Sequence, residues 1–116
     1  MRAAMNLLSR SEENLQVISV LDNRIDAAVA IEFKDAMRAS TDGGCETVVL
    51  DLSQVQFIDS SGLGAIVASM KHMGASRKLA LAGLTPTVEK VFRLTRMDSV
   101  FCVFRTLNEA LGKLKA

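Results

Sequence analysis

The chain has 116 residues, a length that fits one domain and leaves no room for two. Hydrophobic residues make up 49% of it and charged residues 23%, a balance that excludes a disordered or low-complexity chain. The formal net charge is +1, so no broad positive surface for nucleic acid or an anionic membrane is expected. One histidine and two cysteines exclude most metal sites and most catalytic triads. We expect one domain over residues 1–116 with no metal, no cofactor and no catalytic residue.

The cysteines and the N-terminal residues favour a cytoplasmic protein. Cys45 and Cys102 lie far apart in the sequence and match no metal-ligand spacing, so both are expected to stay reduced. The apolar run within residues 1–9 is too short for a signal peptide. No segment approaches the roughly 20 apolar residues that span a bilayer, so direct membrane insertion is not expected.

Strand-like and helix-like segments alternate along the chain. Five segments have the aliphatic and β-branched composition of strands, at residues 7–10, 15–21, 47–52, 78–82 and 100–104. Four segments have apolar residues at helical spacing: between Asp26 and Asp42, from 61 to 74, from Pro86 through Thr95, and from Leu107 through Leu114. The first two strands are expected to form an antiparallel hairpin around a turn at residues 11–14.

This order of elements predicts an α/β fold with a mixed, mostly parallel sheet and an antiparallel N-terminal edge strand. The strand at residues 47–52 is almost continuously apolar, which is typical of a strand covered on both faces. Because crossovers between parallel strands are right-handed, every helix falls on the same face if successive strands are neighbours. We therefore expect helices mainly on one face.

Two helix starts carry residues that typically cap helices. Asp26 is expected to cap the first helix through its side chain. The helix from residue 61 has a buried stripe formed by Leu63, Ile66, Val67, Met70 and Met73. Its opposite face is mostly small, with Gly64, Ala65, Ala68, Ser69 and His72.

The unusual segment is residues 57–64, Phe-Ile-Asp-Ser-Ser-Gly-Leu-Gly, between a strand and a helix. Gly62 and Gly64 are only a weak signal for a dinucleotide fingerprint, because Val67 stands where the third glycine is needed. A serine hydrolase is excluded because His72, the single histidine, lies roughly 18 Å from Ser60 along a helix. Nothing in the chain matches a phosphate-binding P-loop.

A pair of serines at a helix N-terminus remains, with two interpretations. Ser60 or Ser61 could simply cap the helix, since serine is a preferred capping residue. Alternatively, one of them is a phosphorylation site. A phosphate there would meet free N–H groups and the positive end of the helix dipole, and would add about −1.5 to −2 charge at pH 7.

Residues 48–53 and 57–64 together resemble the STAS domain, and more narrowly the bacterial anti-sigma factor antagonists. The likeness covers nearly the whole chain. Residues 84–92 resemble the later Pro-containing helix start of that family, and Asn23 to Asp26 stand at its Gly-x-Leu-Asp turn. The chain departs from the family at Asn23, which replaces the turn glycine, and at residues 96–98, which replace a Gly-containing turn.

The resemblance implies a partner-switching protein. Ser60 would accept phosphate from a GHKL-type serine kinase, which is itself the anti-sigma factor and binds the Mg-ATP. The unphosphorylated chain would bind this kinase and release the sigma factor, phosphorylation would break the complex, and a PP2C-type phosphatase would reset it. The output is a sigma factor or another switched process such as secretion. The expected partner-binding residues are Asn23, Arg24, Asp26, Asp59, Ser61, Gly62, Gly64, Ala65, Ala68 and Ser69.

Two other functions are considered. STAS-like domains also serve as constitutive scaffolds in signalling assemblies and beside lipid-transport ATPases, where the serine is not phosphorylated. Direct nucleotide binding or hydrolysis is disfavoured because the chain lacks a phosphate loop and a catalytic base. A neighbouring gene for a GHKL-type kinase would favour the switch, whereas a transporter operon would favour the scaffold.

Overall fold

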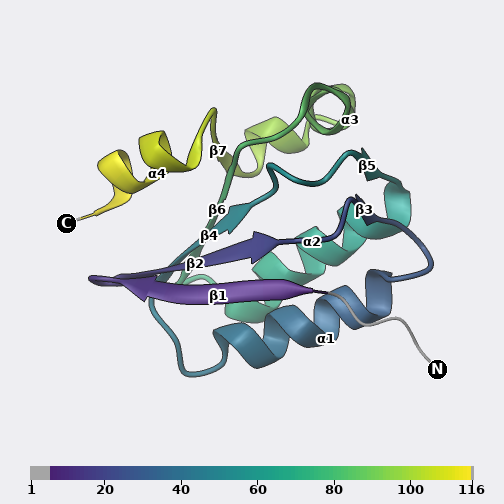
Figure 1. Ribbon diagram of the computed structural model, residues 1–116. Coiled ribbons are helices and arrows are strands. Elements are labelled where there is room, and N and C mark those ends of the chain that lie inside the picture. The colour runs from purple at the N-terminus through teal and green to yellow at the C-terminus, as the bar shows by residue number, and fades with distance from the viewer. Residues whose placement is uncertain (1–5, 116) are drawn as a thin grey trace.

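The computed structural model describes residues 6–115. Residues 1–5, which fall within the N-terminal apolar run of residues 1–9, and residue 116 lie outside the described part of the chain. The strands are β1 (Leu7–Glu12), β2 (Leu15–Val20), β3 (Arg24–Ile25), β4 (Thr47–Asp51), β5 (Phe57–Ile58), β6 (Lys78–Ala82) and β7 (Cys102–Phe104). The helices are α1 (Ala30–Thr41), α2 (Ser60–Met73), α3 (Pro86–Leu94), the short 3₁₀ helix η1 (Met97–Ser99) and α4 (Leu107–Leu114) (Figure 1).

The main sheet has the order β1-β2-β4-β6-β7. β1 pairs with β2 in antiparallel fashion, and all the other pairs of this sheet are parallel. The predicted mixed sheet with an antiparallel edge strand is confirmed. The expectation for residues 47–52 is confirmed as well, because Val48 and Leu50 face one hydrophobic core while Val49 faces a second core on the opposite side.

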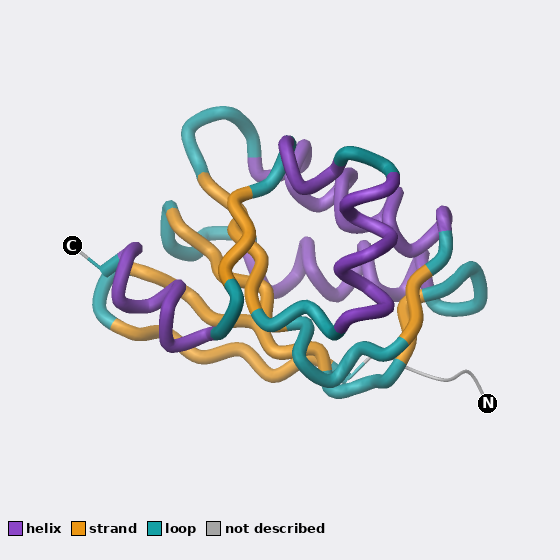
Figure 2. The backbone as a smooth tube through the Cα atoms, turned by 90° about the horizontal axis from the view of Figure 1, so that it is seen from above, coloured by secondary structure: helices purple, strands orange, loops and turns teal. Residues whose placement is uncertain are grey.

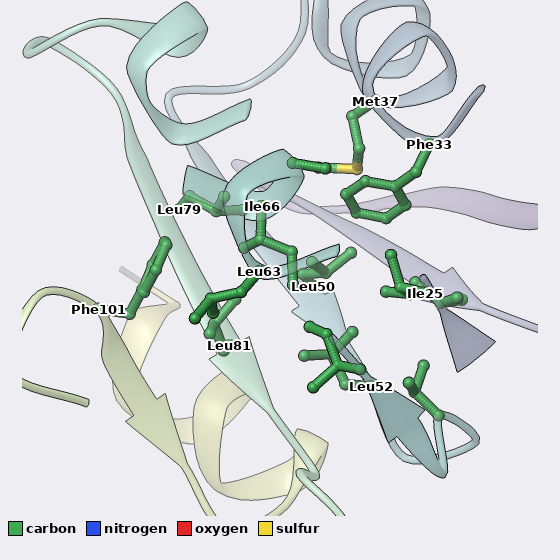
Figure 3. Packing of buried hydrophobic residues seen from close by; sticks show 14 of the residues in the cluster. Ile25, Phe33, Met37, Leu50, Leu52, Leu63, Ile66, Leu79, Leu81 and Phe101 are labelled. Carbon is green, nitrogen blue, oxygen red and sulfur yellow. The ribbon is translucent and has the colours of Figure 1, made fainter. Parts of the chain in front are cut away.

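The larger core lies between the main sheet and the helices α1, α2 and α3. Figure 3 shows Phe33 and Met37 of α1 pointing toward the sheet, near Ile66 of α2 and Leu50 of β4. All four side chains are almost completely buried. Burial of a large aliphatic or aromatic side chain contributes about 1.5–3 kcal/mol, so this layer holds the two helices on the sheet.

Helix α4 lies on the other face of the sheet, against a smaller core made by Leu15, Val17, Val49, Ala82 and Ala110. Figure 2 shows this short helix near the C-terminus, apart from the other three. The expectation of helices mainly on one face is confirmed, because α1, α2 and α3 share one face, and α4 is the exception to the rule that would place every helix there. The handedness rule constrains a helix between two parallel strands, and α4 follows the last strand of the sheet without leading to another.

Three short elements were not expected from the sequence. β3 and β5 form a separate two-stranded parallel sheet, visible side by side in Figure 1. With two residues each, they are too short for an alternating pattern to be recognised. The third element, η1, follows Arg96, whose backbone is left-handed with φ of 62°. Because η1 occupies residues 97–99, β7 begins at Cys102 and not at residue 100.

Candidate functional site

The N-terminus of α2 is capped by Asp59. The backbone N–H of Gly62 donates a hydrogen bond of 2.9 Å to Oδ1 of Asp59. The interpretation that Ser60 or Ser61 caps this helix is therefore wrong. The helix begins one residue earlier than expected, and the two serines are its first two residues.

Both serines are exposed. Neither hydroxyl makes a hydrogen bond within residues 6–115. Since the capping role is filled by Asp59, the hydroxyls of Ser60 and Ser61 are accessible to another molecule. A group attached to either of them would not have to displace a side chain that the fold needs.

Two loops that are distant in the sequence are joined beside these serines. The carbonyl oxygen of Asn23 accepts hydrogen bonds from the N–H of Gln56 at 2.7 Å and of Phe57 at 3.2 Å. β3 then pairs with β5, and the N–H of Asp59 donates to the carbonyl of Ile25 at 3.4 Å. The expected segments at residues 23–26 and 59–62 therefore form one continuous surface.

Gly62 lies inside this junction and is buried. A Cβ atom at this position would overlap the carbonyl oxygen of Ile25 and lie 2.7 Å from its carbonyl carbon. The expectation that Gly62 contacts a partner is corrected for this reason. The space that glycine leaves is filled by the β3 backbone of the same chain.

The Asp59 carboxylate also reaches the first loop, because its Oδ2 accepts the N–H of Ala27 at 3.0 Å. The hydrogen bond from Gly62 is the largest cause that holds the pKa of Asp59 below its ordinary value, and the bond from Ala27 acts in the same direction. Partial burial opposes these bonds but does not cancel them. Asp59 is therefore charged at neutral pH.

This lowered pKa predicts a pH dependence of stability. The contribution of Asp59 is complete above the unfolded pKa of about 3.9 and is lost as the pH falls through the lower folded pKa. The free energy of unfolding of Asp59→Ala should fall below that of the wild type at pH 7, and this difference should shrink at pH 3. Urea unfolding at both pH values measures it. A difference of the same size at pH 3 would contradict the role of the ionised carboxylate.

Arg24 and Phe57 form the exposed rim of the joined loops. The guanidinium carbon of Arg24 lies 5.1 Å from the centre of the Phe57 ring, and its Nε lies 2.9 Å from Oδ2 of Asp26. Phe57 is 41% exposed and was not among the expected partner-binding residues. Ile58, its strand neighbour, faces the core, so strand alternation accounts for the exposure of Phe57, but a two-residue strand leaves no pattern by which the sequence could show it.

Asp26 has a different role from the one expected. Its Oδ1 accepts the N–H of Ala28 at 3.1 Å, which closes a turn. α1 begins only at Ala30, and its N-cap residue Val29 makes no side-chain capping bond. The expectation that Asp26 caps this helix is therefore wrong.

Only part of the small-residue face of α2 is exposed to solvent. Ala65 is 3% exposed and Ser69 is 7% exposed, because α1 packs against α2 along this side. The Ser69 hydroxyl donates to the carbonyl of Ala65 at 2.9 Å. The expectation that Ala65 and Ser69 contact a partner is corrected for this reason: small side chains here allow close helix packing.

The other residues of this face remain accessible. Gly64 is exposed, and Ala68 is half-buried. Ala68 and His72 line a groove of about 280 Å³ between α1 and α2, beside Ile31, which is 69% exposed. A larger cavity, of about 550 Å³, lies between α3 and β7 and includes none of the expected site residues.

The described part of the chain offers few groups for other chemistry. No cluster of three histidine, cysteine, aspartate or glutamate side chains that could hold a metal is present in residues 6–115. His72 is in the last turn of α2, at the opposite end of the helix from Ser60, and its Nε2 lies 3.2 Å from Oδ1 of Asp42. No helix within these residues has the length and apolar character needed to cross a membrane.

Comparisons with known proteins agree with this architecture. The family model of the STAS domain matches residues 9–110. The anti-sigma-F factor antagonist RsfB of Mycobacterium tuberculosis is 26% identical over 101 residues, which cover 87% of this chain and 83% of RsfB. The crystal structure of an anti-sigma factor antagonist from Mycobacterium paratuberculosis matches with a TM-score of 0.86 and 26% identity, covering 97% of this chain and 96% of that chain.

A third match concerns the fold alone. The structure of the Bacillus cell fate determinant SpoIIAA in the phosphorylated form has a TM-score of 0.69 and 21% identity, covering 97% of this chain and 100% of SpoIIAA. The family match extends over both joined loops and the serine pair. This chain belongs to the STAS domain family.

Proposed function

We propose that this chain, over residues 1–116, is an anti-sigma factor antagonist that works by partner switching. The observation that carries the proposal is the pair of free serine hydroxyls at the start of α2, beside a surface built from two joined loops. Relatives over most of the chain, such as RsfB, are named anti-sigma factor antagonists. The chain would act as a substrate and a binding surface, not as an enzyme.

The switch is phosphorylation of Ser60 by a partner serine kinase of the GHKL type. The Ser60 oxygen attacks the γ-phosphorus of ATP, the bond to the β-phosphate oxygen breaks, and ADP leaves. The hydroxyl proton passes to a base of the kinase, which also holds the magnesium ion. A PP2C-type phosphatase restores the hydroxyl by transferring the phosphoryl group to water. In this scheme the STAS domain supplies only the accepting hydroxyl and its position.

The contact surface for the kinase consists of exposed or half-buried residues around Ser60: Asn23, Arg24, Asp26, Phe57, Asp59, Ser61, Gly64 and Ala68. Gly62, Ala65 and Ser69 are buried, so they would support this surface from inside the fold and not contact the kinase. Unphosphorylated Ser60 would lie within the complex. The added dianion would then be desolvated without a partner charge, which favours dissociation.

Mass spectrometry of the phosphorylated peptide tests the assignment of Ser60. The purified chain is incubated with its cognate kinase and Mg-ATP, and the peptide that contains both serines is fragmented. We expect a single phosphate on Ser60 in the wild type and in Ser61→Ala, and none in Ser60→Ala. Phosphate on Ser61, or a Ser60→Ala protein that is still modified, would show that the assignment is wrong.

A further inference from the structure

Asp59 uses both of its carboxylate oxygens within the chain. Oδ1 accepts the N–H of Gly62 in α2, at 2.9 Å, and Oδ2 accepts the N–H of Ala27 in the other loop, at 3.0 Å. These two donors are 35 residues apart in the sequence. One carboxylate therefore connects the start of α2 to the loop that follows β3.

Along the described part of the chain, the bond from Ala27 to Asp59 is the last hydrogen bond that joins the two loops. The ladder of β3 and β5 ends at Ile25, whose carbonyl accepts the N–H of Asp59. The next hydrogen bonds, from Ala28 and Val29, both return to Asp26 and are local. Within residues 6–115, the segment from Asp26 to Val29 is thus tied to the start of α2 through the Asp59 side chain.

We propose that Asp59 is a positioning residue for partner binding. It fixes the segment 26–29 against the start of α2, so that the two halves of the kinase-binding surface keep one arrangement. Its consequence for the kinase rests on the proposed function, whereas its effect on the loop does not. Asp59 lies in the proposed contact surface, but this positioning role needs no hydrogen bond to the kinase, because both carboxylate oxygens already bond to the chain's own N–H groups.

Replacing Asp59 with asparagine tests the positioning role, because the two side chains differ in their acceptor oxygens. A carboxylate offers two acceptor oxygens on one carbon, whereas the asparagine side chain has one acceptor oxygen and one donor group. Asparagine is as good a helix N-cap as aspartate. Asp59→Asn should therefore keep the hydrogen bond from Gly62 and lose the one from Ala27, which separates capping from positioning.

Amide hydrogen exchange of the free protein, followed residue by residue by NMR, measures both bonds. In Asp59→Asn we expect exchange of the Ala27 amide to rise by about tenfold, as for the loss of one charge-assisted hydrogen bond, with the Gly62 amide unchanged. Asp26→Asn is the matched control, because it removes one negative charge from the same loop but leaves the Asp59 bridge intact. In this control the Ala27 amide should exchange as in the wild type.

Kinase binding supplies the second readout. We expect Asp59→Asn to bind the kinase about tenfold more weakly than the wild type, mainly through faster dissociation from a less ordered surface. An unchanged Ala27 exchange rate in Asp59→Asn would overturn the inference, and so would faster exchange combined with unchanged kinase affinity. If neither the wild type nor Ser60→Ala bound the kinase, the proposed function would fail, while the exchange rates would still decide whether Asp59 positions the loop.

Discussion

Replacing Ser60 with alanine is expected to produce a protein that stays bound to its kinase in the presence of Mg-ATP, whereas the wild type is released. The exposed Ser60 side chain makes no hydrogen bond within residues 6–115, so its removal leaves the fold and the contact surface intact. The kinase can then bind the variant but cannot modify it. Ser60→Asp should bind weakly from the start, because it places one permanent charge at the same point.

The charge of a phosphate on Ser60 can account for the change from a bound to a released protein. Converting a complex that is 99% bound into one that is 1% bound requires about 5.5 kcal/mol. A phosphoserine carries about −1.5 to −2 charges at pH 7, which would reverse the sign of a domain with a net charge of +1. Transfer of an unpaired charge out of water costs several kcal/mol, and the neighbouring Asp59 carboxylate would add repulsion.

Analytical gel filtration of the mixture, with and without Mg-ATP, measures the release. Ser61→Ala is the matched control, since Ser61 is also exposed and adjacent but is not the proposed acceptor. It should be released like the wild type. If Ser60→Ala dissociated on addition of Mg-ATP, or if Ser60→Asp bound as tightly as the wild type, phosphorylation of Ser60 would not be the switch.

The topology of the sheet could be predicted from the sequence because each long strand and each crossover helix has its own pattern. Residues 47–52 were correctly assigned to a strand covered on both faces, since nothing polar interrupts it before Asp51. The position of α4 could not be predicted in the same way. Its apolar stripe requires a partner surface, and both faces of the sheet offer one.

The candidate site was predicted in part for similar reasons. The loops at residues 23–26 and 59–62 were expected to act together, but the short β3–β5 ladder that joins them leaves no periodic signal. Three consecutive residues, Asp59 to Ser61, are all good helix caps, so the sequence alone could not select Asp59. Ala65 and Ser69 were placed on an exposed face because small side chains do not show whether a helix or solvent covers them.

Gly62→Ala is expected to destabilise the protein and to weaken kinase binding, although alanine favours helices over glycine. The helix propensity alone would stabilise the variant by about 1 kcal/mol. The added Cβ atom would, however, overlap the backbone carbonyl of Ile25, which has no rotamer by which to move away. Overpacking typically costs about 1–3 kcal/mol, and here a backbone carbonyl must shift, which places the cost in the upper part of that range and above the gain in propensity.

Gly64→Ala provides a control within the same helix. Gly64 is two residues further along α2, is exposed, and has no atom within 4 Å of the place where a Cβ would stand. Only the propensity and chain-entropy effects remain, so this variant should be more stable than the wild type by about 0.4–1 kcal/mol. The two substitutions are chemically identical and should change stability in opposite directions.

Urea unfolding of the three proteins measures the free energies, and amide exchange of Ala27 and Asp59 reports whether the joined loops have separated. In Gly62→Ala both amides should exchange faster, because moving α2 away from Ile25 stretches the bonds that hold the loops together. In Gly64→Ala both rates should stay at the wild-type level. A Gly62→Ala protein as stable as Gly64→Ala would mean that β3 can move away from α2 at little cost. The rigid junction on which the proposed kinase surface depends would then be absent.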